Sequence, residues 1–156
     1  MMKKIARFAF QLGAKIALNV NFVVEKAGRY FLLSEALKKV AGKDFYYAGT
    51  YFGKVKNGKF FPSFNLLSML AKVEANKIVV EKKAAWLFIC GRDVFRNGIL
   101  EVRGSRKKGS HTLVINEFGE CLGFGKIVGK LDEAVKKNGV AIRNISDIGD
   151  FLRREI

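Results

Sequence analysis

The sequence predicts an α/β (α+β) N-terminal domain, with helices and antiparallel strands, followed by a small β-barrel domain. Three features predict this order. Apolar residues recur at helical spacing near the N-terminus, an Asn-Gly pair separates two aromatic runs as in a β-hairpin, and short strand-like runs become frequent after residue 76. Several short strands with small helices are typical of a compact barrel. We place the two domains at residues 1–74 and 75–156.

The N-terminal domain begins with a helix and then forms hairpins. Ile5 and Phe8 belong to the apolar face of a helix predicted over residues 3–16. Ser34 is placed to cap a helix, and Asn57-Gly58 predicts a type I′ turn because both residues tolerate positive φ. The other predicted elements are strands over residues 18–26, 30–33, 44–56 and 59–61, and helices over residues 35–40 and 66–73, the last capped by Asn65.

The C-terminal domain is predicted to consist mainly of short strands. Ser146 is placed to cap a closing helix that ends at Arg153 and Arg154. The apolar run over residues 84–90 is assigned to no particular element. The remaining predictions are strands over residues 77–81, 98–103, 112–117, 121–128 and 140–144, and short helices over residues 91–96 and 131–137.

The charge of the chain is its clearest functional signal. The sequence has 29 Lys or Arg against 14 Asp or Glu, a net charge of +15. Such a charge repels itself in a compact protein and is best tolerated beside a polyanion. Nucleic acid is therefore the first partner to consider and an anionic membrane surface the second, while a basic protein with neither partner stays open. Residues 1–72 carry +10 and residues 73–156 carry +5.

The candidate RNA-binding residues lie in the second half of the chain. Seven of its 16 basic residues are Arg, against two of 13 in the first half. Arg makes forked contacts with phosphate and stacks on bases, whereas Lys acts as a point charge, so the second half suits structured RNA better. The predicted RNA-binding residues are Arg92, Arg103, Arg106, Lys107, Lys108, Lys126, Arg143, Arg153 and Arg154. Aromatic residues that either stack on bases or fill the core are Tyr46, Tyr47, Tyr51, Phe60 and Phe61, with the core favoured for most.

No pattern in the sequence indicates catalysis, a metal or a cofactor. His111 is the single histidine, so a triad of nucleophile and base has one candidate base. The glycines of residues 123–130 do not have the spacing of a dinucleotide or phosphate loop, and a tight corner with close backbone approach explains them better. Cys90 and Cys121 form no metal-binding motif and are expected to be reduced core residues. We therefore predict a protein that is not an enzyme.

Two stretches resemble a known RNA-binding module. Residues 91–99, from Gly91 to Ile99, resemble the helix and glycine turn that open a PUA domain. Residues 122–126 resemble the glycine-flanked strand of the same domain, which occurs in pseudouridine synthases and archaeosine transglycosylases. The resemblance implies that the predicted barrel is a PUA domain.

A second resemblance covers residues 44–156 and is carried by the order of three motifs. Residues 49–54 (Gly-Thr-Tyr-Phe-Gly-Lys), Lys59-Phe60 and residues 147–155 are similar to the Nip-seven family of ribosome-biogenesis factors. This resemblance implies an archaeal-type factor for the large ribosomal subunit that binds precursor ribosomal RNA without catalysis. The terminal Arg pair of the family corresponds to Arg153 and Arg154.

The expected partners are RNA and ribosome-assembly or RNA-processing proteins. The longest uncharged run, residues 60–71, is too short to cross a membrane and contains Pro62, so we expect a cytoplasmic monomer with no membrane partner. Two alternatives stay open: an accessory subunit of an RNA-modifying enzyme, and an adaptor that binds proteins. An enzyme would need its acid or base in residues 1–72, which contain only Glu25, Glu35 and Asp44 as acids, in no catalytic motif.

Overall fold

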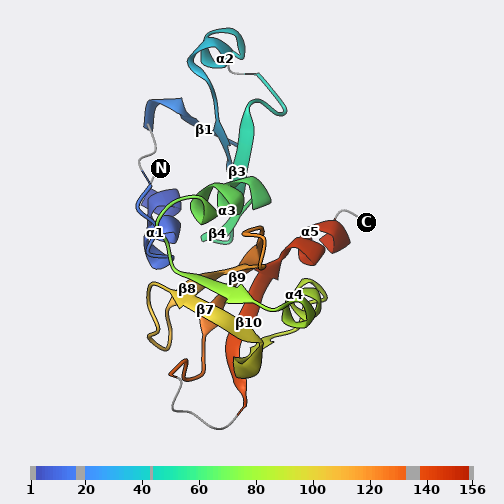
Figure 1. The fold of residues 1–156 in the computed structure, drawn as a ribbon. Helices are drawn as coiled ribbons and strands as arrows, with labels where there is room; N and C mark the ends of the chain where they lie inside the picture. Colours follow the sequence, from blue (N-terminus) through green and yellow to red (C-terminus); the bar gives the residue numbers. More distant parts are fainter. Residues whose placement is uncertain (1–2, 17–19, 43, 133–137, 155–156) are drawn as a thin grey trace.

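The computed structural model describes residues 3–16, 20–42, 44–132 and 138–154, which form two sheets with helices between and beside them (Figure 1). The first sheet is antiparallel, with strand order β1-β2-β3-β4. The second has the order β6-β10-β9-β8-β5-β7 and is antiparallel except where β5 pairs with β8. The predicted fold class, an α/β N-terminal part followed by a small barrel, is confirmed, and the barrel is an open half-barrel.

Two tight turns build the first sheet. Ala27 and Gly28 have φ angles of 51° and 75°, and Asn57 and Gly58 have φ angles of 50° and 75°, as a type I′ turn requires. Both predicted hairpins therefore form, although the strand predicted over residues 44–56 begins only at Thr50. The strands are β1 (Val23–Lys26), β2 (Arg29–Leu32), β3 (Thr50–Lys56) and β4 (Lys59–Pro62), preceded by a 3₁₀ turn, η1 (Val20–Phe22).

The helices of the first half are α1 (Lys3–Gln11), α2 (Glu35–Val40) and α3 (Phe64–Ala71). Ser34 caps α2 as predicted. The predicted cap of α3 was wrong: the hydroxyl of Ser63, not Asn65, accepts the N–H of Leu66 at 3.2 Å. The first helix is shorter than the predicted span of residues 3–16, because Gly13 turns the chain in a left-handed conformation with φ of 62°.

The second half contains a helix that the sequence did not predict. The apolar run over residues 84–90 lies mostly in a helix, α4 (Lys82–Ile89). The helix predicted over residues 91–96 was wrong, because a short strand and a 3₁₀ turn occupy this stretch. The helix predicted over residues 131–137 falls largely outside the described residues. The strands are β5 (Lys77–Val80), β6 (Val94–Phe95), β7 (Ile99–Arg103), β8 (His111–Ile115), β9 (Cys121–Ile127) and β10 (Val140–Asp147), and the 3₁₀ turn is η2 (Arg96–Gly98).

The closing helix α5 (Ile148–Arg154) begins directly after β10. Its first turn is capped by the carboxylate of Asp147, whose Oδ1 accepts the N–H of Asp150 at 2.8 Å. The predicted cap, Ser146, was therefore wrong by one residue. No helix in the described parts of the chain is long and apolar enough to cross a membrane.

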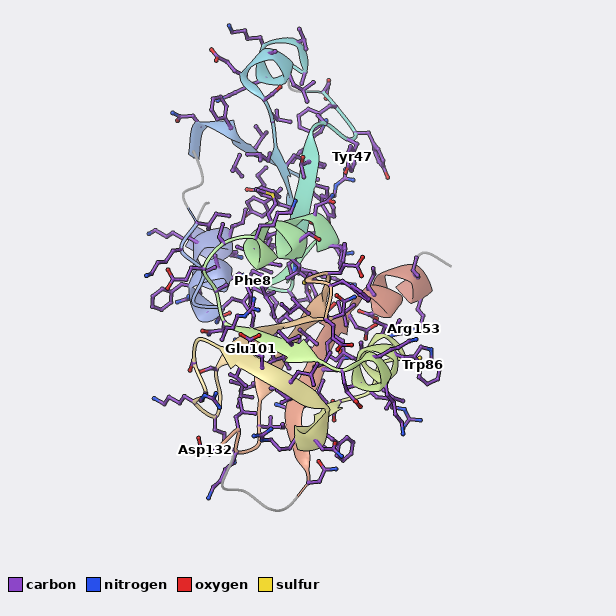
Figure 2. All side chains as sticks on the ribbon, viewed as in Figure 1. Phe8, Tyr47, Trp86, Glu101, Asp132 and Arg153 are labelled. Atoms are coloured by element: carbon purple, nitrogen blue, oxygen red, sulfur yellow. The ribbon has the colours of Figure 1, made fainter. Side chains whose placement is uncertain are left out.

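The two sheets are joined through α1 and α3, which lie between them (Figure 1). Phe8 of α1 lies at this joint (Figure 2). Its ring packs edge-on against Phe60 of β4 and Phe124 of β9, with ring centroids 5.6 and 5.2 Å apart. One hydrophobic cluster includes these rings together with Leu66 of α3 and Leu113 of β8. The cluster crosses the predicted division at residues 74 and 75, so the two halves share a core, while their assignment as separate domains stays a prediction.

Asn76 adds a polar link at the same joint. Its backbone N–H donates to Leu12 O at 2.7 Å and its backbone O accepts from Leu113 N at 2.9 Å. Its side chain accepts from Ser105 N at 3.0 Å and donates to His111 O at 3.1 Å. One residue thus ties the chain after α1 to both ends of the loop before β8.

The two cysteines lie in different surroundings. Cys121 is buried in the shared cluster, and burial raises the pKa of its thiol to about 11. Cys90 ends α4 and is exposed, so the expectation that both cysteines lie in the core was wrong for Cys90.

Replacing Phe8 tests the joint between the halves. Phe8→Ala is expected to lower the free energy of unfolding by about 3–5 kcal/mol, because it removes a buried ring from between two sheets. Phe10→Ala is the matched control, since Phe10 lies on the same helix with 83% of its surface exposed, and it should change stability by less than about 0.5 kcal/mol. Urea denaturation measures both, and equal effects would contradict the role given to Phe8.

Candidate nucleic-acid interface

Lys126 and Arg143 form a pair of adjacent cations on the second sheet. Arg143 of β10 lies opposite Lys126 of β9, and His111 of β8 lies opposite Lys126 on its other side. We call Lys126 and Arg143 the basic row. The neighbouring Gly125 lets β9 and β10 approach closely, since a Cβ there would lie 2.5 Å from Arg143 O. This confirms that the glycine-rich stretch serves close backbone approach.

A second group of cations lies in the loop that leads into β8. Arg106, Lys107 and Lys108 are all exposed, and we call them the basic loop. Two backbone hydrogen bonds hold the end of this loop against Ile127: Gly109 N donates to Ile127 O at 2.8 Å, and Ile127 N donates to Ser110 O at 2.9 Å. Because Ile127 follows Lys126, the basic loop is anchored beside the basic row.

These cations differ from Arg103 in having no acidic partner among the described residues. Arg103 Nε and a terminal nitrogen contact both carboxylate oxygens of Glu101, at 2.8 and 3.0 Å. The same contact lowers the pKa of Glu101. The positive charge of Arg103 is therefore largely balanced, whereas that of the basic row and basic loop is available to an anion.

Arg153 has a structural partner as well. Its guanidinium contacts both carboxylate oxygens of the buried Asp147 at 3.3 Å and donates to Ile89 O at 3.3 Å, which links α5 to α4 (Figure 2). The exposed Arg92 follows α4, and its backbone oxygen accepts from Asn144 at 3.3 Å. The side chain of Arg154 lies outside the described residues. The RNA-binding role of these three Arg residues stays a prediction.

A groove of about 600 Å³ lies at the joint between the halves. α1 contributes Lys4 and Arg7 to its lining, and the start of β4 contributes Lys59. Four aromatic rings line it as well, those of Phe8, Phe60, Phe61 and Phe124. None of the described residues that line the groove is acidic. The groove therefore combines an apolar wall with an unbalanced positive rim, in the size range of roughly 300–1,000 Å³ seen for ligand pockets.

His111 connects the groove with the basic row. Its ring lines the groove, and its centroid lies 6.3 Å from that of Phe124. Burial lowers the pKa of His111, and the nearby charge of Lys126 lowers it further. The imidazole is therefore neutral at pH 7. The groove and the basic row form one continuous surface through this residue.

The sequence indicated only part of this surface. Lys126 and Arg143 were predicted, but Lys4, Arg7 and Lys59 of the first half were not among the predicted RNA-binding residues. The spacing of Lys4 and Arg7, three residues apart on a predicted helix, placed them on one face and could have marked them as a pair. The charge pattern does not reveal that this face meets the second sheet.

The candidate stacking residues divide into two groups. Phe60 and Phe61 line the groove, and Phe60 also packs against the shared core. None of the three tyrosines lines the groove. Tyr47 and Tyr51 pack around Phe31 in the first half, with ring centroids 5.3 and 5.5 Å from that of Phe31. Of these aromatic residues, only Phe60 and Phe61 belong to the groove.

Comparison with known families identifies the second half. The sequence model of the UPF0113 PUA domain matches residues 76–156. This chain belongs to the UPF0113 PUA domain family. The basic row and the basic loop therefore lie in its PUA domain, and the match begins at Asn76.

A curated relative from Archaeoglobus fulgidus, described as a UPF0113 protein, is 30% identical over 112 residues, which are 70% of this chain and 63% of the relative. The match spans less than two thirds of that relative's length.

Solved structures support the fold of the entire UPF0113 chain. A conserved PUA domain protein from Thermoplasma acidophilum has a TM-score of 0.64 and 22% identity, covering 99% of this chain and 95% of its own. A hypothetical protein from Pyrococcus horikoshii has a TM-score of 0.63 and 21% identity, covering 98% and 92%. At this level of identity, the likeness shows the fold, including that of the N-terminal half before the PUA domain.

The contact between Arg153 and Asp147 is expected to stabilise the fold, so its removal should lower stability. Arg153→Ala is expected to lower the free energy of unfolding by about 1–2 kcal/mol, because a buried carboxylate loses its cation but keeps its other hydrogen bonds. Arg143→Ala is the control and should change stability by less than about 0.5 kcal/mol. Thermal and urea denaturation measure the difference, and an unchanged Arg153→Ala protein would show that the contact contributes nothing.

Proposed function

We propose that this chain is a non-catalytic RNA-binding protein that contacts RNA through the basic row and basic loop of its PUA domain. The main support is that the basic loop is anchored beside Lys126 and Arg143. Among the described residues, none of these cations has an acidic partner. Several unbalanced cations on one surface suit a chain of phosphates, because each contact releases a condensed counterion. The net charge of +15 favours the same partner.

The absence of catalysis is part of the proposal. Histidine would be the natural general base in the groove, yet the described groove residues offer His111 no carboxylate that could orient its ring. Lys126 is the charged neighbour that acts on His111, and a cation opposes protonation of the ring. A binding role for this surface is therefore better supported than proton transfer. Incubation of the protein with RNA, followed by mass spectrometry, should leave the RNA mass unchanged.

We further propose a role in biogenesis of the large ribosomal subunit, with precursor ribosomal RNA as the ligand and assembly proteins as further partners. The support is the resemblance to the Nip-seven family in residues 49–54 and 147–155, together with the PUA domain. Residues 49–54 lie at the start of β3 and residues 147–154 form the end of β10 and α5. The resemblance is therefore carried by both halves of the chain and not by the PUA domain alone.

A salt titration tests the RNA surface. Lys126→Ala/Arg143→Ala is expected to weaken RNA binding and to reduce the slope of log affinity against log salt by roughly two, one for each phosphate contact. Arg103→Ala is the matched control, since Glu101 already balances its charge, and its slope should stay close to that of the parent. Fluorescence anisotropy with a structured RNA measures both. Equal slopes for all three proteins would refute the assignment of the basic row.

Recovery of bound RNA tests the biological role. Crosslinking in cells, followed by sequencing, is expected to enrich large-subunit ribosomal RNA precursors with the parent protein and much less with Lys126→Ala/Arg143→Ala. Arg103→Ala should recover about as much ribosomal RNA precursor as the parent and more than Lys126→Ala/Arg143→Ala, because recovery in cells and affinity in solution depend on the same phosphate contacts. Enrichment of other RNA classes without ribosomal precursors would keep the RNA-binding role and reject the ribosomal one.

A further inference from the structure

The groove at the joint has features that the proposed phosphate-binding surface does not use. Its lining includes aromatic rings and three cations, and it lies between α1, β4 and the second sheet. Phosphates alone would need only the cations. An apolar, ring-lined wall under a positive rim has the combination of surfaces that a nucleotide presents, namely a flat base and a charged phosphate.

We infer that this groove binds an unpaired nucleotide of single-stranded RNA, with the base against Phe61 and His111 and the flanking phosphates on Arg7 and Lys59. The inference rests on the proposed RNA-binding function and adds a preference for single-stranded over duplex RNA. Sequence-specific RNA recognition generally uses unpaired bases, whose faces and edges are exposed, because the bases of a duplex are already stacked and paired.

Phe61 is the ring best suited to contact a base. It is half-buried, and among the described residues it belongs to none of the three hydrophobic clusters. Phe8 and Phe124 are part of the shared core, and Phe60 packs against that core. Phe61 lies in β4, an edge strand of the first sheet. The outer backbone groups of an edge strand are not used by a neighbouring strand, and they can pair with the edge of a base.

His111 provides a second flat surface and a connection to the basic row. It is half-buried and neutral, and neutral imidazole stacks on bases without adding a desolvated charge. Lys126 and Arg143 continue from His111 across the sheet. An RNA strand whose base enters the groove would therefore leave along cations that already suit its phosphates.

Charge also argues against an apolar peptide in the groove. Lys4, Arg7 and Lys59 have no acidic partner among the described residues, and an apolar segment would leave all three unbalanced. An acidic peptide would satisfy the cations but would not need the aromatic wall. A nucleotide uses both parts of the lining, so it is the occupant that the groove favours.

The test compares a single-stranded RNA oligonucleotide with a duplex of the same composition. Phe61→Ala/His111→Ala is expected to lower the affinity for the single strand by roughly 5- to 100-fold, the loss that follows removal of a stacking partner, and to change the affinity for the duplex by less than about twofold. Phe61→Trp should retain binding, because a larger aromatic ring replaces the first. Phe10→Ala, which alters an exposed ring outside the groove, should bind both RNAs like the parent.

A second pair of variants keeps the test valid if the first double variant folds poorly. Arg7→Ala/Lys59→Ala should reduce the salt slope for the single strand by roughly two. Lys82→Ala/Lys83→Ala removes the same charge from the first turn of α4, which contributes no residue to the groove, and should not do so; neither lysine has an acidic partner among the described residues. Equal losses for these two variants would show a general charge effect and overturn the inference.

The outcomes separate this inference from the proposed function. If the parent binds both RNAs and the groove variants do not change single-strand binding, the groove inference fails while RNA binding by the PUA domain survives. If the groove variants lose single strand and duplex alike, the preference for an unpaired base is wrong. If the parent binds neither RNA, the proposed function and the inference fail together, and an acidic peptide becomes the better occupant.

Discussion

The packing of Phe8 between Phe60 and Phe124 is the contact on which the rest of the structure depends. It joins α1 to the edge of the first sheet and to the middle of the second. Without this joint, the two sheets would each expose an apolar face, and no groove would exist between them. The same rings that hold the halves together therefore also form the wall of the candidate site.

Two features then decide which polar groups surround that wall. Asn76 fixes the start of β8 through His111 O and the loop before it through Ser105 N, so His111 is held at the edge of the groove. Gly125 allows β9 and β10 to approach, which places Lys126 beside Arg143. Both features act on the backbone, and they determine the positions of the His111 ring and of the Lys126 and Arg143 cations.

Charge acts differently at different positions of this surface. Arg103 and Arg153 resemble Arg143 in the sequence, but carboxylates balance the first two and no described acid balances the third. A count of basic residues treats all of them alike. Only their neighbours decide which can attract RNA, because a cation already paired with a carboxylate releases fewer counterions when a phosphate arrives.

The sequence by itself determined the fold class, both hairpin turns, the cap of α2 and the excess of positive charge, because helical spacing, turn residues and composition are local properties. It also indicated the PUA domain through residues 91–99 and 122–126, although the first of these stretches is not the helix that it resembled. The caps at Ser63 and Asp147 were missed by one or two residues, since neighbouring polar side chains compete for the same role. Tertiary structure alone decided that α1 meets the second sheet, that Asp147 balances Arg153, and that Arg7, Lys59 and His111 share one groove, because these contacts join residues far apart in the chain and leave no periodic signal in the sequence.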